Sequence, residues 1–136
     1  MNIGVLSFIV LFTGNLMGAV VGGVDLHGNS TTKPDEKLYL AAARSFQGGH
    51  WATSARWFDE LINRFSESPR RAKATLLLGQ SLFQQKKYRE AYGVLANNQL
   101  SAGELADEYL YWMAECRHSQ GNLDAADQVF GELLRG

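Results

Sequence analysis

The side chains that could do chemistry in this 136-residue chain are few and widely separated. Its three histidines, His27, His50 and His118, never take the H-E-x-x-H spacing that places two imidazoles on one helix face. The adjacent acid pairs at 59–60 and 107–108 fall in sequence that favours helix, where neighbouring side chains diverge by about 100°. Neither a phosphate-binding G-x-x-x-x-G-K nor a nucleophile elbow G-x-S-x-G occurs. We therefore predict no enzyme activity, no metal site and no cofactor.

Cysteine content and charge bear on which kinds of site and which partners this chain can have. Cys116 is the only cysteine, which excludes an intrachain disulfide, and its helical surroundings predict a buried small residue. The formal net charge is −1 and the isoelectric point about 6.3, so no basic footprint for nucleic acid is present. Charge is nevertheless uneven, since residues 33–98 carry a net +5 and residues 99–136 a net −5. Such a polarity could orient a protein partner.

The first 24 residues differ from the rest of the chain. Residues 3–24 contain no charged side chain and end in small residues, which is typical of a secretory signal peptide cleaved after Gly18 or Ala19. No cysteine follows that could carry a lipid, and the same stretch is also long enough to span a bilayer as an uncleaved anchor. We predict export to the periplasm or cell exterior, with membrane anchoring by residues 3–24 as the alternative. The polar residues 25–34 are then a flexible linker.

The remainder of the chain is repetitive. Segments 48–58, 86–95 and 121–130 align, with Trp51, Tyr88 and Leu123 separated by 37 and 35 residues. In each segment a small residue follows three positions later, and a large apolar residue four positions after that. These residues are Ser54, Ala91 and Ala126, followed by Phe58, Leu95 and Phe130. A period of this length is typical of stacked helical repeats.

The same register continues upstream of each segment. Small residues Ala42, Gly79 and Ala114 are each followed four positions later by Phe46, Phe83 and His118. Each unit therefore reads as a helix, a short turn at 47–50, 84–87 or 119–122, and a second helix. Where two antiparallel helices cross closely there is room for little more than a Cβ, so the small residues predict the crossing points.

This pattern resembles the tetratricopeptide repeat (TPR) family. The resemblance implies an all-α, right-handed α-solenoid of about three helix-turn-helix units, with repeats near 35–71, 72–106 and 107–136 in a TPR domain at 35–136. The join at 58–79 is similar to joins in bacterial cell-envelope TPR proteins of the Tol-Pal cell-division coordinator and outer-membrane assembly lipoprotein types. Lys86 departs from the family's turn glycine, and Leu123 from its aromatic residue.

The resemblance also implies a function, which is protein–protein interaction. The first helix of each unit lines a concave groove that takes peptides or partner helices. The family's groove positions carried over to this chain are Tyr39, Phe46, Leu76, Gln80, Phe83, Tyr111, Glu115 and His118. The alternative is that the apolar members pack between repeats. A basic cluster of Arg64, Arg70, Arg71 and Lys73 either docks a carboxylate-rich partner or forms a solvated turn.

The carboxyl-terminal end suggests a second function. Val129, Leu133 and Leu134 are predicted to form an apolar face that no further helix covers. The chain is then either a fragment of a longer array or a structural subunit of an envelope assembly that associates with itself through this face. We expect a protein or peptide partner, or another copy of the chain, and membrane contact only if residues 3–24 are retained.

Overall fold

The computed structural model describes residues 32–136, and Lys33–Gly136 form one compact unit. The predicted signal peptide or anchor at 1–24 and nearly all of the predicted linker lie outside the described residues. Within residues 32–136, no helix is both long enough and apolar enough to cross a membrane.

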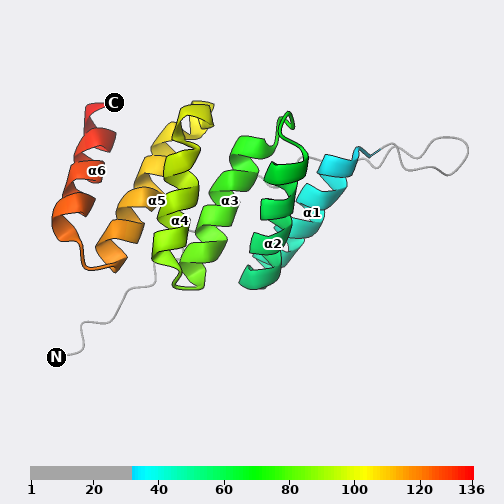
Figure 1. The fold of residues 1–136 in the computed structure, drawn as a ribbon, viewed down its shortest axis with the longest axis horizontal. Helices are drawn as coiled ribbons and strands as arrows, with labels where there is room; N and C mark the ends of the chain where they lie inside the picture. Colours follow the sequence, from blue (N-terminus) through cyan, green and yellow to red (C-terminus); the bar gives the residue numbers. More distant parts are fainter. Residues whose placement is uncertain (1–31) are drawn as a thin grey trace, which may run out of the picture. The chain divides into compact units, whose positions relative to one another are not determined.

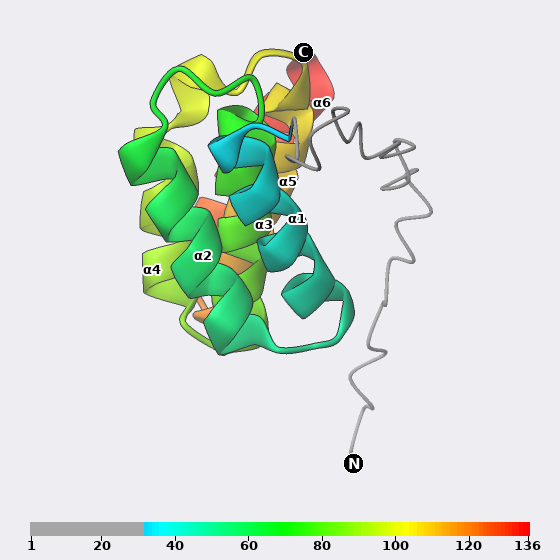
Figure 2. The same ribbon diagram turned by 90° about the vertical axis from the view of Figure 1, so that its right-hand side faces the viewer.

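The described residues form three antiparallel helix pairs arranged in a row (Figure 1). The pairs are α1 (Pro34–Gln47) with α2 (Trp51–Arg64), α3 (Arg71–Gln84) with α4 (Tyr88–Asn97), and α5 (Ala106–Ser119) with α6 (Leu123–Arg135). Two 3₁₀ turns, η1 (Gln99–Ser101) and η2 (Gly103–Leu105), join α4 to α5. Viewed along the row, α1 and α3 lie on one side, and α2 and α4 on the other (Figure 2). The predicted all-α solenoid is confirmed.

The short turn inside each pair depends on one residue in the left-handed backbone region. That residue is Gly49 in the first pair and Gly121 in the third, with φ of 73° and 76°. Lys86 takes the same place in the second pair with φ of 62°, although a side chain disfavours this conformation. The chain tolerates the strain because packing on both sides of the turn requires it.

Replacing this lysine by glycine should therefore stabilise the fold. We expect Lys86→Gly to raise the free energy of unfolding by about 0.5–1 kcal/mol, since glycine adopts a positive φ without steric cost. Chemical denaturation measures the change. Lys87→Gly is the control, because Lys87 has φ of −87° and gains nothing from glycine. An equal gain in both variants would show that loss of charge, rather than relief of strain, is responsible.

The predicted small residues do lie at the helix crossings. Ala42, Ala91 and Ala114 are fully buried, as is Ser54, whose hydroxyl lies 3.1 Å from that of Ser81 on α3. The tightest crossing is at Gly79, where an added Cβ would lie 2.9 Å from Cγ of Leu95. The spacing thus identified the contacts between α3 and α4 correctly.

The third repeat departs from the predicted pattern of large residues. Phe58 and Leu95 are fully buried, but Phe130 is only partly buried, whereas the adjacent Val129 on α6 is 8% exposed. The prediction that Val129 belongs to an exposed apolar face is therefore wrong, because α6 turns this side chain toward α5. Leu133 is also partly buried, and only Leu134 is largely exposed, at 87%.

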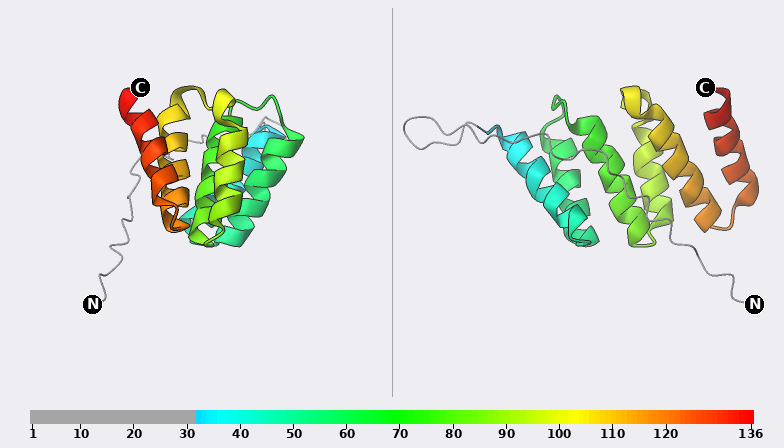
Figure 3. Two further views of the ribbon diagram at one scale, coloured as in Figure 1. Left: turned by 60° about the vertical axis from the view of Figure 1, so that its left-hand side comes forward. Right: turned by 180° about the vertical axis from the view of Figure 1, so that it is seen from behind.

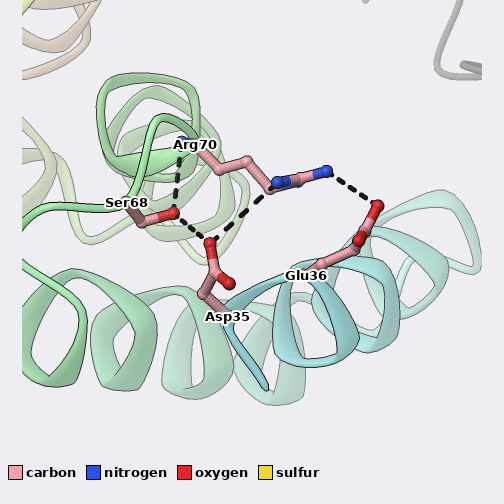
Figure 4. A network of polar contacts seen from close by, with 4 residues as sticks. All are labelled: Asp35, Glu36, Ser68 and Arg70. Carbon is pink, nitrogen blue, oxygen red and sulfur yellow. Dashed lines mark hydrogen bonds and ion pairs between the residues drawn. The ribbon is translucent and has the colours of Figure 1, made fainter. Parts of the chain in front are cut away.

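The join between the first two repeats is held by a polar network (Figure 4). Ser68 donates a hydrogen bond of 2.6 Å from Oγ to Oδ2 of Asp35, and accepts one from the backbone N–H of Arg70 at 3.2 Å. The Arg70 guanidinium also bonds Glu36 at 2.8 Å and lies 4.0 Å from Asp35. The Ser68 hydrogen bond, aided by Arg70 and opposed by burial, lowers the pKa of Asp35 below its usual value.

These contacts account for the basic cluster predicted from the sequence. Arg64 pairs with Glu60, and Arg70 with Asp35 and Glu36. The Lys73 ammonium lies 3.6 Å from the Glu108 carboxylate, and Arg71 donates to the Asn98 side chain at 3.2 Å. Arg70 and Lys73 therefore tie neighbouring repeats together, whereas Arg64 and Arg71 contact groups within their own repeats. A docking role for this cluster toward an acidic partner stays a prediction.

The Asp35 contact makes stability depend on pH. Because its pKa is lower in the folded state than in the unfolded chain, the stabilisation it provides is present above the unfolded pKa of about 3.9 and is lost as pH falls through the folded pKa. As the pH is lowered from about 5 to about 2, the free energy of unfolding of Ser68→Ala should therefore fall by less than that of the wild type. Urea denaturation across this range tests it. Ser66→Ala, at an exposed serine two residues away, should retain the wild-type pH dependence.

Candidate protein-binding surface

Two of the predicted groove aromatics stabilise the turns of their own repeats. The Phe46 ring packs edge to face on Trp51 across the first turn, with 5.1 Å between ring centroids. Phe83 and Tyr88 repeat this arrangement across the second turn at the same distance. Phe46 and Phe83 are both half-buried, so each supports a turn and also presents an edge to solvent.

Three predicted groove residues at equivalent repeat positions, Tyr39, Leu76 and Tyr111, do not form a continuous surface. Tyr39 is half-buried against Phe58, with ring centroids 5.8 Å apart, and the Arg70 guanidinium lies 5.9 Å from its ring centre. Leu76 is fully buried in the core between the second and third repeats. Its prediction as a groove residue is therefore wrong, because α3 is the middle first helix and its neighbours cover it from both sides.

Four half-buried aromatic side chains instead form a series of ring contacts around α5. Phe83 packs on Trp112 at 5.2 Å, Trp112 on Tyr111 at 5.6 Å, and Tyr111 on Phe130 at 6.4 Å between ring centroids. This aromatic row, defined as Phe83, Trp112, Tyr111 and Phe130, joins α3, α5 and α6, and all four members are half-buried. Burial, and secondly the Glu115 carboxylate, raises the pKa of Tyr111.

Polar side chains accompany the aromatic row. Gln80 and Glu115, both predicted as groove residues, are partly exposed, and His118 is exposed near the end of α5. The structure thus leaves seven of the predicted groove residues at least partly accessible: Tyr39, Phe46, Gln80, Phe83, Tyr111, Glu115 and His118. Half-buried rings beside polar groups are typical of a surface that takes apolar anchors from a protein partner.

Two important aromatic residues carry no signal in the repeat spacing. Trp112 is central to the aromatic row, yet its equivalents in the earlier repeats, Leu40 and Leu77, are aliphatic. Tyr109 is fully buried, and its hydroxyl donates a 2.6 Å hydrogen bond to the carbonyl of Ala72 on α3. A buried phenol needs such an acceptor, so Tyr109 fixes α5 against α3. Only the packing of the two helices shows this role.

Cys116, the one cysteine of the sequence, is a buried residue of the fold. Cys116 is fully buried, as predicted, and burial raises the pKa of its thiol to about 12, which keeps it protonated. In residues 32–136, no three His, Cys, Asp or Glu side chains lie close enough to hold a metal ion.

A hollow that the sequence did not predict is lined by residues of α2, α3 and α4. It has a volume of about 620 Å³, and its floor includes Leu78 and Leu82, which are 3% and 8% exposed. Its lining includes two positively charged side chains, Arg56 and Lys87, and two negatively charged ones, Asp59 and Glu90.

The comparison with known families agrees with this architecture. A family model described as "Anaphase-promoting complex, cyclosome, subunit 3" matches residues 47–133, from the first turn to the end of α6. A search of curated proteins found no match to the chain. The matched family is built of TPR-like repeats, which is the repeat type that the spacing of small and aromatic residues predicted. Since the match spans more than half of the sequence, the chain belongs to this TPR-like family, whose repeats generally mediate protein–protein interaction.

Proposed function

We propose that this protein is an exported interaction scaffold that binds a peptide or partner protein on the surface formed by α1, α3 and α5. The observation that carries the proposal is the aromatic row beside Gln80, Glu115 and His118. A partner with one or two aromatic or aliphatic anchors would pack on the ring edges. Its backbone or polar side chains would bond to Gln80 and Glu115.

The family membership supports a scaffold rather than a catalyst. The matched family is described as a subunit of the anaphase-promoting complex, and TPR-like repeats generally bind proteins. The cell-envelope setting rests on residues 3–24 and on the resemblance of the join at 58–79 to bacterial envelope TPR proteins. We propose on this basis that the chain acts in the periplasm or outside the cell.

Selection from a displayed peptide library tests the binding surface directly. We expect enriched peptides to carry aromatic or aliphatic anchors and to bind the wild-type protein saturably. Gln80→Arg combined with Glu115→Arg should weaken their binding at least about tenfold, which corresponds to about 1.4 kcal/mol. Both positions are partly exposed, so the fold should tolerate the change.

The matched control carries the same two kinds of substitution away from the aromatic row. Glu104→Arg with Gln128→Arg alters net charge equally at exposed positions of η2 and α6. Equal affinity of the selected peptides for both double variants and the wild type would exclude this surface as the binding site. Denaturation curves of each variant separate loss of binding from loss of fold.

Location can be tested with the full chain expressed in a bacterial host. Export with cleavage predicts a mature protein that begins at Ala19 or Val20 and is released with the periplasmic contents. A full-length product in the membrane fraction would favour the anchor instead. Full-length protein in the cytoplasmic fraction would contradict export in either form.

A self-associating structural subunit is the second candidate function. The apolar face predicted for it is much smaller than expected, because Val129 is buried and Leu133 partly buried. The exposed Leu134 and the unequal charge of the two halves of the chain still favour contact between copies. Any such contact must therefore depend largely on charge.

A further inference from the structure

The two ends of the helix row carry opposite charge. The first helix, α1, and the last, α6, stand at opposite ends in Figure 1 and in the right-hand view of Figure 3. The outer face of α1 has exposed Lys37 and Arg44, with Leu38 and Ala41 partly exposed between them. We call these residues the α1 end face. The spacing of all four places them on one side of the helix, away from the buried Ala42 and Ala43.

The α6 end face consists of Asp124, Asp127, Gly131 and Leu134. Their spacing also places them on one side of a helix, opposite the buried Ala126 and Val129. Both aspartates are exposed, Gly131 is partly exposed, and Leu134 is 87% exposed. Arg135, at the edge of this face, bonds through Nε to the carbonyl of Gly131.

The protein itself shows how two such faces pack. Within the chain, α4 packs on α5, and Arg117 lies over the Tyr92 ring, 3.7 Å from its centre. When the repeats are aligned, Tyr92 on α4 has the same position as Asp127 on α6. In the same alignment, Tyr109, Met113 and Cys116 on α5 have the positions of Lys37, Ala41 and Arg44 on α1, in that order. On α5 these three residues are buried, whereas their equivalents on α1 are more polar.

Copying the α4–α5 packing onto two chains gives a complementary antiparallel pair. When α6 of one copy takes the place of α4, and α1 of another the place of α5, Gly131 falls opposite Ala41 at the crossing. Leu134 then falls opposite Leu38, and Asp127 falls opposite Ser45, next to Arg44, with Asp124 one turn further along. Small, apolar and charged positions each meet a suitable counterpart.

We propose that copies of this chain stack head to tail, with the α6 end face of one on the α1 end face of the next. This contact joins two different surfaces, so it extends into an open row of copies rather than closing as a dimer. Its exposed ion pair and small apolar area make it weak and sensitive to salt. It uses none of the residues of the aromatic row.

Disulfide trapping in the full chain tests the register. Ala41→Cys in one copy and Gly131→Cys in another should crosslink under mild oxidation at low salt. The native Cys116 is buried and does not compete. The new side chain at position 131 meets only the flexible end of Arg135, at 3.3 Å. Pairing Ala41→Cys with Glu104→Cys is the control, because position 104 is exposed but lies on neither end face.

Charge exchange then tests the chemistry. Adding Arg44→Asp to the Ala41→Cys chain should reduce the crosslink with the Gly131→Cys chain at least about threefold, and adding Asp127→Arg to the latter should restore it. Crosslinking no greater than in the control pair would overturn the proposal and assign the end charges to solubility alone. If the crosslink yield stays the same in the charge-exchanged variants, the proposed pairing of Asp127 with Arg44 is wrong. Gln80→Arg with Glu115→Arg should leave crosslinking unchanged, which separates this result from failure of the peptide-binding surface.

Discussion

Phe58→Ala is expected to lower the free energy of unfolding by about 3–5 kcal/mol, the range for truncating a buried phenylalanine. Phe58 is fully buried and packs on Tyr39 within the first repeat. Its removal leaves a cavity that the surrounding helices fill only in part. Urea denaturation followed by circular dichroism measures the loss, and the conservative Phe58→Leu, at about 1 kcal/mol, gives a value even if the alanine variant unfolds.

The comparison with Phe130 makes this prediction specific. Phe130 has the same position in the third repeat but is only partly buried, because Val129 enters the core there. Phe130→Ala should therefore cost less, about 1–2 kcal/mol, since less apolar area returns to water. Equal losses at the two positions would show that the third repeat packs like the first, contrary to the structure.

Gly79→Ala is expected to destabilise the fold even though alanine is the better helix former. The new Cβ would lie 2.9 Å from both Cγ and Cδ2 of Leu95, and Leu95 is fully buried and cannot move aside. Overpacking of this kind costs about 1–3 kcal/mol, against a gain of about 1 kcal/mol in helix propensity. Thermal and chemical denaturation should both show a net loss.

Gly93 supplies the matched control within the neighbouring helix. A Cβ added there meets no atom within 4 Å, so Gly93→Ala should stabilise the protein by about 1 kcal/mol through helix propensity alone. Opposite signs at the two glycines would establish that close approach of α3 and α4 requires the small residue. If both variants gain stability, the crossing is looser than described and the repeat spacing has another cause.

The repeat architecture was predictable from the sequence because it is encoded locally. Turn positions, helix faces and crossing residues such as Ala42 and Gly79 recur at a fixed spacing, and helical geometry converts that spacing into one side of a helix. The structure places the turns and the buried small residues where this reasoning predicted. Even the irregular turn at Lys86 adopts the backbone conformation of its glycine counterparts.

The candidate surface was predictable only in part. The sequence identified which side of α1, α3 and α5 each candidate occupies, but the exposure of a side chain depends on helices distant in the sequence. Leu76 is hidden because α3 has neighbours on both sides, whereas Tyr111, at the same repeat position, remains partly exposed near the end of the row. Trp112 joins the aromatic row through Phe83, a residue from another repeat.

The sequence by itself determined that the chain is a row of helix pairs with small residues at the crossings, since periodicity alone specifies which residues share a helix face. The tertiary structure decided which of those faces remain accessible. It also decided that Arg70 binds Asp35 and Glu36, about one repeat away, and that Val129 rather than Phe130 enters the core. These outcomes depend on the distance and angle between packed helices, which no single repeat specifies.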